Sequence, residues 1–314
     1  MASFEETNPC DIPLETVVGA LRAFFPDIRE GDVSFIYHGT YNVFEVRGDY
    51  IFRFPDSSLL NEDGHELIQY EHEILQTLGP HISLEIPQYE YLSEDPELPF
   101  VGYRKIPGVS LSTCFDRTTK KIRGQMAEKL GGFLSELHSP EVYEAYMDKW
   151  PTDFTGDAFK EYWESYYSLM QERVYPELDP DQRAWVTRLF SDYLEDEDNF
   201  AFEPRVVHGD FDISNIIVDP DSYQVQGIID FEETRFWDPA ADLLFFNEGD
   251  DFIDLILEGY TQPPGPNLEG RMRFLYNRVP LIYVSTGIEL DYREMVEAGF
   301  SMLEARMSLL TWGL

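Results

Sequence analysis

The chain has 314 residues and carries 23 Lys and Arg against 60 Asp and Glu, which gives a formal charge of −37. This charge excludes a nucleic-acid-binding protein, which needs a basic groove for phosphates, and it disfavours adsorption to anionic lipid. Hydrophobic residues make up 43% and aromatic residues 15%, too many for a disordered chain.

The acidic charge has two readings. A low lysine content with abundant Asp and Glu is typical of salt adaptation, in which the carboxylates are simply solvated surface. Alternatively, an acidic surface attracts a cationic ligand. All six lysines lie between Lys105 and Lys160, so the first hundred residues contain arginine as their only strongly basic residue.

Cysteine content and hydropathy indicate the compartment. Two distant cysteines, Cys10 and Cys114, form neither a disulfide framework nor a metal cluster. The start of the chain, Met1–Thr7, is acidic and has no apolar signal region. No run approaches the ~18 apolar residues of a membrane span. We therefore expect a cytoplasmic, soluble monomer.

The first hundred residues predict an antiparallel sheet with flanking helices. Three short β-rich runs are separated by glycine turns, a pattern typical of a meander. Apolar residues with helical spacing predict one helix before these runs and one after them. The expected elements are a helix at 14–25, strands at 33–37, 41–46 and 50–54, a helix through 67–78, and strands at 86–91 and 100–106.

The remainder of the chain is predicted to be mainly helical. The segment Pro107-Gly108 breaks the strand pattern and predicts a joint between two domains, 1–106 and 107–314. A helical insertion is expected at about 140–200. The expected elements are a helix at 126–137, two helices within 157–195, β structure at 205–231, and helices after about 240 with a loop at 263–266.

The most informative pattern is a predicted hairpin near residue 222. Two β-branched runs, 216–218 and 225–229, flank the turn Asp-Pro-Asp-Ser. Opposed residues in an antiparallel pair have a constant index sum, so Asn215 and Asp230 should lie close together at the open end. Asp210 lies in the loop that enters the first strand. Three oxygen-bearing side chains are therefore expected to converge.

These oxygen ligands favour Mg²⁺ and phosphoryl transfer. Hard cations that keep waters and phosphate oxygens prefer carboxylate and amide ligands. In kinase-type sites one Asp receives the hydroxyl proton, while an Asn and a second Asp hold the metal. The competing interpretation is that Asp210 and Asn215 are turn and capping residues, for which Asp and Asn are common.

The same segment resembles a known family. His208-Gly-Asp210, Asn215 and Asp230 are similar to the motif of the aminoglycoside phosphotransferases, and Asp238-Pro-Ala-Ala-Asp242 resembles the element that follows it. The segment 131–138 resembles a helix end of the same family, and 50–55, 99–108 and 283–289 most resemble the aminoglycoside 2''-phosphotransferases.

The resemblance implies a fold and roles for residues. It implies an α+β, bilobal, protein-kinase-like fold with an antiparallel β-sheet N-lobe and a mainly helical C-lobe. Asp210 would be the catalytic base, Asn215 and Asp230 would bind Mg²⁺, and His208 and Asp242 would support the catalytic loop. The co-substrate would be ATP or GTP.

The nucleotide site departs from the protein-kinase pattern. The strand lysine that usually holds phosphates is absent, and Arg53 occupies the equivalent position; a guanidinium can still grip phosphate. Its implied partner is Glu71, with Glu73 as the alternative. The implied purine contacts are Tyr103, Arg104 and Ile106. Glu232 stands where protein kinases have glycine.

The leading interpretation is a small-molecule kinase that phosphorylates an aminoglycoside hydroxyl and thereby confers antibiotic resistance. Candidate residues for the cationic substrate are Glu233, Glu248 and Glu289. A macrolide 2'-phosphotransferase, or a salt-adapted kinase for a sugar or amino alcohol, remains an alternative. A different class, a catalytically silent nucleotide-binding module, is suggested by the missing lysine and by a single glycine, Gly39, in the loop after the first strand.

Overall fold

The computed structural model describes residues 9–93, 95–152 and 154–310. The acidic start of the chain, Met1–Thr7, lies outside the described residues. The chain folds as two compact units. Unit 1 holds the chain up to Leu137 together with Asp212–Thr234, and unit 2 holds His138–Phe211 together with the chain from Arg235 onward.

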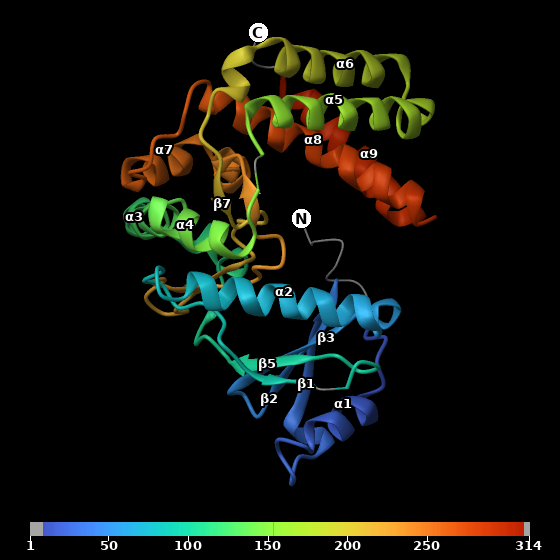
Figure 1. Cartoon of the computed structure of the whole chain (residues 1–314), viewed down its shortest axis with the longest axis vertical. Coiled ribbons are helices and arrows are strands. Elements are labelled where there is room, and N and C mark those ends of the chain that lie inside the picture. The colour runs from blue at the N-terminus through green and yellow to red at the C-terminus, as the bar shows by residue number, and fades with distance from the viewer. Residues whose placement is uncertain (1–8, 94, 153, 311–314) are drawn as a thin grey trace. The chain divides into compact units, whose positions relative to one another are not determined.

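Unit 1 is built on a five-stranded antiparallel sheet with the strand order β1-β2-β3-β5-β4 (Figure 1). The first three strands form the predicted meander, and β5 adds next to β3. The strands are β1 (Val33–His38), β2 (Tyr41–Val46), β3 (Tyr50–Pro55), β4 (Tyr89–Leu92) and β5 (Val101–Arg104).

A helix covers each face of this sheet. On one face, α1 (Leu14–Leu21) packs an apolar side against Phe44, Phe52 and Phe54. On the other face, α2 (Glu62–Leu78) brings Ile68 against the second set of strand side chains. Figure 1 shows the two helices on opposite sides of the strands. Successive side chains of a strand alternate between the faces, which is why one short sheet supports two cores.

The rest of unit 1 is a helix and a small sheet. The helix is α3 (Lys120–Leu137), and the three-stranded sheet has the order β6-β8-β9. Strand β9 also bridges to the segment before β4, where the Ile228 N–H donates to the Glu85 carbonyl at 2.9 Å. The strands are β6 (Val109–Ser110), β8 (Ile216–Val218) and β9 (Val225–Ile228).

Unit 2 is mainly helical, as predicted for the second half of the chain. Its aromatic core includes Trp163, Phe190 and Phe274, which α5, α6 and α8 contribute. Two short strands, β7 (Arg205–Val207) and β10 (Arg235–Trp237), pair antiparallel. The helices are α4 (Pro140–Lys149), α5 (Gly156–Arg173), α6 (Pro180–Glu195), α7 (Asp250–Gly259), α8 (Leu268–Glu289) and α9 (Arg293–Leu310).

The fold class is confirmed, and the differences are local. The first helix ends at Leu21 rather than Phe25, because Phe25 turns to pack against Tyr50, Phe52 and Tyr91. Helix α4 lies within the helical insertion expected at about 140–200. The strands β6 and β10 were not predicted, since they have only two and three residues, too few for a periodic signal. No helix among the described residues is long and apolar enough to cross a membrane.

The predicted domain boundary at 106/107 stays a prediction. The compact units divide elsewhere, because α3 and the β6-β8-β9 sheet belong with the five-stranded sheet in unit 1. One contact within unit 1 that joins these parts is the bridge between Gly227 of β9 and Glu85, in the segment before β4.

We predict that Gly227→Ala destabilises the protein. A Cβ at residue 227 would lie 2.3 Å from the Glu85 carbonyl oxygen and 3.0 Å from Ile106 Cδ1, so the backbone would have to move. We expect a loss of about 2 kcal/mol in the free energy of unfolding, measured by chemical denaturation. Gly132→Ala in α3 is the control, since no atom lies within 4 Å of its added Cβ; it should raise stability by about 0.5–1 kcal/mol. Equal effects at both positions would contradict the prediction.

Candidate active site

A buried arginine organises the candidate nucleotide site in unit 1. The Arg53 side chain on β3 is only 5% exposed. Its Nη1 donates to both carboxylate oxygens of Glu71 on α2, at 2.8 and 2.9 Å, and its Nη2 donates to Asp230 Oδ1 at 2.8 Å. Nη2 also donates to Glu232 Oε2 at 3.2 Å, and the guanidinium lies 4.0 Å from the centre of the Tyr41 ring. One cation therefore joins a strand, a helix and the segment after β9.

The acid on α2 is Glu71, as the resemblance implied, and not Glu73. Glu71 is fully buried and also accepts a hydrogen bond from the Phe231 N–H at 3.1 Å. Glu73, two residues further along the helix, accepts instead from Gln69 on its own helix. Residues two apart on a helix do not share a face, so only one of the two can reach the sheet.

The charged groups around Arg53 shift the pKa of the arginine itself and that of Glu232. Burial alone would lower the pKa of Arg53, but Glu71 and Asp230 raise that pKa well above its ordinary value. Burial, together with the nearby Asp230, raises the pKa of Glu232 to about 8 even though Arg53 opposes the shift. The raised pKa favours the protonated form of Glu232, which limits the negative charge beside the arginine.

The predicted hairpin places Asn215 beside the residue that precedes Asp230. Strand pairing gives Ile216 opposite Ile228, and the Ile229 N–H donates to the Asn215 carbonyl at 3.0 Å. The index sum is thus 444 at this end rather than the 445 predicted. It is 443 at the Val218–Val225 pair next to the turn, and the register irregularity between Ile217 and Val218 raises it by one. Asn215 and Asp230 still share the open end of one hairpin.

Asp230 has a backbone conformation that few non-glycine residues adopt. Its φ is +71°, in the left-handed region. Such strain costs on the order of 1 kcal/mol or more and persists only where surrounding contacts hold it. Here the ion pair to Arg53 and the bond from the Phe231 N–H to Glu71 hold the segment. The side-chain oxygens of Asn215 and Asp230 are ligands of the type that Mg²⁺ prefers, so the open end of the hairpin fits this ion.

In unit 2 a second buried charge holds the loop after β7. Asp242 is fully buried, and its two carboxylate oxygens accept hydrogen bonds from the His208 N–H at 2.7 Å and the Gly209 N–H at 3.0 Å. His138 Nε2 lies 3.1 Å from Asp242 Oδ2, and its Nδ1 lies 2.8 Å from the Tyr260 hydroxyl. Asp242 therefore anchors the backbone just before Asp210.

These partners decide the ionisation of Asp242. Burial alone would raise its pKa, but hydrogen bonds and the nearby His138, His208 and Gly209 outweigh burial, so the pKa is lowered. The carboxylate therefore stays ionised and keeps accepting from the loop. His208 itself is fully buried, and its Nδ1 accepts a hydrogen bond from the Asp210 N–H at 3.3 Å.

Asp210 is exposed, whereas the residues that hold its loop are buried. Gly209 has a φ of +89°, a conformation that suits glycine and turns the chain directly before Asp210. The chain passes from unit 2 to unit 1 between Phe211 and Asp212, so Asp210 belongs to unit 2 and Asn215 to unit 1. Their proposed meeting at one metal-nucleotide site stays a prediction.

The three predicted purine contacts lie at the end of β5. Tyr103 is buried and packs near Tyr89, with ring centres 5.8 Å apart, and Ile106 is buried beside Gly227. Arg104 is exposed and lies over the Tyr50 ring. The intervening Lys105 N–H already donates to the Asp49 carbonyl at 2.8 Å, so that amide is committed to the sheet.

The three acidic substrate candidates differ in setting. Glu233, in unit 1, is exposed, and Glu248, in unit 2, is partly buried. Glu289, at the end of α8, forms an ion pair with Arg173 Nη1 at 2.6 Å, which neutralises much of its charge. A hollow of about 330 Å³ in unit 2 contains none of the predicted site residues; its lining includes Trp185, Arg188, Tyr193, Arg273 and Phe274.

Sequence reasoning missed two contacts of Arg53. Glu232 was noted only as a substitute for glycine, yet it lies two residues after Asp230 and reaches the same guanidinium. The segment is not extended, since Asp230 has a positive φ and Glu232 lies in a turn, so no periodic spacing could have revealed this contact. The Tyr89 hydroxyl, 3.3 Å from Arg53 Nη1, had no motif to reveal it.

We predict that Asp242→Asn destabilises unit 2. The amide nitrogen of Asn would face a backbone N–H that now donates to the carboxylate, which leaves a buried donor unsatisfied. We expect a loss of about 3 kcal/mol in the free energy of unfolding, measured by chemical denaturation. Asp221→Asn, at an exposed position in the β8–β9 turn, is the matched control and should change stability by less than ~0.5 kcal/mol. A loss no greater than that of the control would contradict the prediction.

The raised pKa of Glu232 gives a pH prediction. A carboxyl whose folded-state pKa is raised binds its proton more tightly in the folded chain, so stability falls as pH rises from the ordinary value to about 8. Glu232→Gln removes this titration. The difference in unfolding free energy, variant minus wild type, should therefore increase between about pH 5 and about pH 9, because other groups cancel in the comparison. A difference that is flat over this range would contradict the prediction.

Comparison with known proteins places these features in a family. The model of the phosphotransferase enzyme family matches residues 32–275. Among solved structures, the GDP complex of wild-type aminoglycoside 2'-phosphotransferase-IIIa superposes with a TM-score of 0.83 at 23% identity, covering 95% of this chain and 99% of that one. The macrolide 2'-phosphotransferase MphH from Brachybacterium faecium gives 0.69 at 18% identity, covering 92% and 98%. At these identities the likeness concerns the fold.

Curated sequences match a shorter part of the chain. A probable acyl-CoA dehydrogenase, IBR3, from Arabidopsis thaliana is 23% identical over 203 residues, or 62% of this chain. Acyl-CoA dehydrogenase family member 11 from Rattus norvegicus is 30% identical over 112 residues, or 35% of this chain. The matched regions are only 24% and 13% of the length of those proteins. The family model spans most of the chain, and the fold agrees with it: this chain belongs to the phosphotransferase enzyme family.

Proposed function

We propose that the protein is a small-molecule kinase that transfers the γ-phosphate of ATP or GTP to a hydroxyl of an aminoglycoside. The observation that carries this proposal is the buried Arg53–Glu71 pair, whose guanidinium also holds Asp230 at the end of the hairpin that bears Asn215. Within a phosphotransferase family, this arrangement supplies a phosphate-binding cation next to two oxygen ligands for a metal.

The metal would be held by Asn215 and Asp230. Mg²⁺ supplies charge neutralisation for nucleotide phosphates when it is bound. Asp230 Oδ1 accepts a hydrogen bond from Arg53 Nη2, and the positive φ at Asp230 fixes where its side chain leaves the backbone. Protonation of Glu232, which its raised pKa favours, would keep a third anion from competing for the same arginine.

Arg53 takes the place of the lysine found in protein kinases. Its Nη1 is committed to Glu71, which fixes the side chain in the core of unit 1. Its Nη2 donates to Asp230 and Glu232; we assign this nitrogen to phosphate binding, for which a phosphate oxygen would replace one of these two acceptors. A planar guanidinium can hold one carboxylate with one nitrogen and a phosphate oxygen with the other, which a single ammonium cannot do with the same geometry.

Asp210 would receive the proton of the acceptor hydroxyl. As the acceptor oxygen forms its bond to the γ-phosphorus, the bond from phosphorus to the β–γ bridging oxygen breaks and the nucleoside diphosphate leaves. The exposed side chain and the backbone anchored by Asp242 suit a group that must meet substrate while its loop stays fixed.

The aminoglycoside assignment rests on charge and on the relatives. Solved relatives include the GDP and kanamycin complex of APH(2")-IIIa and a gentamicin complex of APH(2")-IIa. A chain with a formal charge of −37 would attract such polycations. Glu233 and Glu248 remain our candidates for ammonium groups. Glu289 pairs with Arg173 Nη1, which an ammonium group would have to displace.

Two alternatives are separated by one assay. A macrolide substrate is suggested by the macrolide 2'-phosphotransferase among the structural relatives, and a silent nucleotide-binding module by the missing lysine. Release of nucleoside diphosphate should be measured with kanamycin, gentamicin, a macrolide, and either ATP or GTP. Turnover with the aminoglycosides supports the proposal, turnover with the macrolide alone overturns the substrate class, and nucleotide binding without any turnover favours the silent module.

We predict that Asp210→Ala lowers kcat by at least about 100-fold, the usual size of a general-base contribution. The KM for the nucleotide should change little, because the replaced group acts on the acceptor hydroxyl. Asp221→Asn, exposed in the β8–β9 turn, is the control and should retain wild-type kcat. A smaller loss in a variant that unfolds at the wild-type denaturant concentration would exclude Asp210 as the base.

A further inference from the structure

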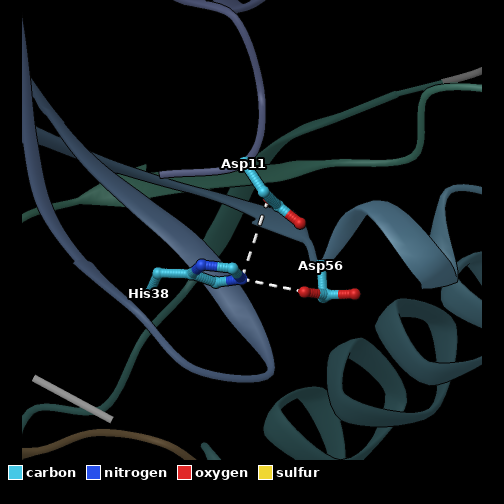
Figure 2. Close-up of side chains that lie close together, drawn as sticks. All are labelled: Asp11, His38 and Asp56. Atoms are coloured by element: carbon cyan, nitrogen blue, oxygen red, sulfur yellow. Dashed lines mark hydrogen bonds and ion pairs between the residues drawn. The ribbon is translucent and has the colours of Figure 1, made fainter. Parts of the chain in front are cut away.

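Three ligand-type side chains meet on unit 1 outside the site described above. His38 ends β1, Asp56 follows β3, and Asp11 precedes α1. Figure 2 shows one edge of the His38 ring facing both carboxylates. His38 Nε2 lies 2.9 Å from Asp56 Oδ2 and 3.7 Å from Asp11 Oδ1, and the three ligand atoms all lie within 4.8 Å of one another.

The other polar atoms of all three side chains are already held from outside the cluster. His38 Nδ1 lies 2.7 Å from the Pro9 carbonyl, which can only accept, so Nδ1 carries a proton. Asp56 Oδ1 accepts from the Ser58 N–H at 2.8 Å, and Asp11 Oδ2 accepts from the Ser57 N–H at 2.9 Å. These bonds orient Nε2 and one oxygen of each carboxylate toward a common point.

Asn42 adds a buried support. It is fully buried on β2, its amide nitrogen donates to Asp11 Oδ1 at 2.6 Å, and its amide oxygen accepts from the Asp11 N–H at 3.2 Å. Two bonds in opposite directions fix Asp11 although it lies in an exposed segment. Backbone carbonyls behind a histidine and hydrogen bonds behind ligating carboxylates are the outer contacts typical of metal sites in proteins.

We propose that His38 Nε2, Asp11 Oδ1 and Asp56 Oδ2 form a binding site for a divalent transition-metal ion of the zinc class. With metal–ligand bonds of about 2.0–2.2 Å, tetrahedral ligands lie roughly 3.4 Å from one another. The two distances from Nε2, 2.9 and 3.7 Å, fall on either side of this value. One imidazole and two carboxylates leave a fourth position for water.

The surroundings suit a cation. With Nδ1 donating to the Pro9 carbonyl, Nε2 faces two carboxylates at 2.9 and 3.7 Å, and either a proton or a metal ion on Nε2 would compensate their negative charge. Burial raises the pKa of Asp11, but hydrogen bonds from Ser57 and Asn42 outweigh burial, so the pKa of Asp11 is lowered and the group stays ionised. The neighbouring Cys10 is not a ligand, since its thiol donates to the Ile12 carbonyl and burial raises its pKa.

An ion at this position would tie three segments together. The ligands come from the chain before α1, from the end of β1 and from the end of β3. The next two residues after His38 are Gly39 and Thr40, which form the turn to β2, and the Asp56 N–H donates to the Thr40 carbonyl at 2.8 Å. Metal binding would therefore stiffen this turn and stabilise unit 1, a role separate from the proposed kinase activity.

The test uses the full chain after removal of metal with a chelator. Zn²⁺ should be titrated by calorimetry and Co²⁺ by its visible absorption, with unfolding measured in zinc and in chelator. We expect one tight equivalent of Zn²⁺, Co²⁺ absorption bands of a four-coordinate ion, and a denaturation midpoint that rises with zinc concentration.

Matched variants assign the ion to this cluster. Asp56→Asn and His38→Gln each remove one ligand and should weaken zinc binding at least about tenfold. Asp56→Asn keeps an oxygen that can accept from Ser58, so it tests the site even if His38→Gln fails to fold. His65→Asn, on the exposed side of α2, should bind zinc as the wild type does.

Two results would overturn the proposal. Zinc affinity in Asp56→Asn equal to the wild type would place the bound ion elsewhere on this acidic surface. A wild-type chain equally stable in zinc and in chelator would identify the cluster as a protonated imidazole paired with carboxylates, with no metal.

Discussion

Unit 1 depends on the placement of one positive charge in an apolar interior. Arg53 is separated by 18 positions from Glu71 and by 177 from Asp230, yet a single guanidinium binds both. Removing one partner of a buried ion pair leaves an uncompensated charge and costs far more than the pair contributes in water. The strand, the helix and the segment after β9 are therefore held in register by the same group that we assign to phosphate. Tyr70 reinforces this arrangement, since its hydroxyl donates to the Thr234 carbonyl at 2.6 Å.

Unit 2 also fixes a loop with a buried charge, but there the charge is negative. There a buried carboxylate, Asp242, accepts donors from the backbone of the His208–Gly209 segment and from His138. A cation that gathers carboxylates and an anion that gathers N–H groups are two ways of fixing a loop in a medium of low dielectric constant. In both units, what is fixed is the backbone next to an exposed or partly exposed acid, Asp230 in one and Asp210 in the other.

The sequence predicted what depends on local pattern or on a motif. The β1–β2–β3 meander follows from glycine turns between β-rich runs, and Asn215 and Asp230 were brought to one hairpin end by counting alone. The count was wrong by one residue because the point on which the turn is centred is set by the folded backbone and leaves no mark in the order of residues. Arg53 and Glu71 came from resemblance. The raised pKa of Glu232 could not be predicted, because it results from burial beside Asp230, which only the folded chain defines. The His38 cluster was missed because its members belong to no shared motif.

Unit 1 is formed by two segments that are far apart in the sequence, and this affects how the chain folds during synthesis. Residues 212–234 complete this unit but are made only after the 74 residues of His138–Phe211. Until they emerge, Arg53 and Glu71 lack Asp230 and the Phe231 N–H, and Glu85 lacks its bridge to Gly227. Contacts of such long sequence separation form late and slowly. A nascent chain that stops before residue 212 would thus expose an incomplete unit 1, and this intermediate is where chaperones would be expected to act.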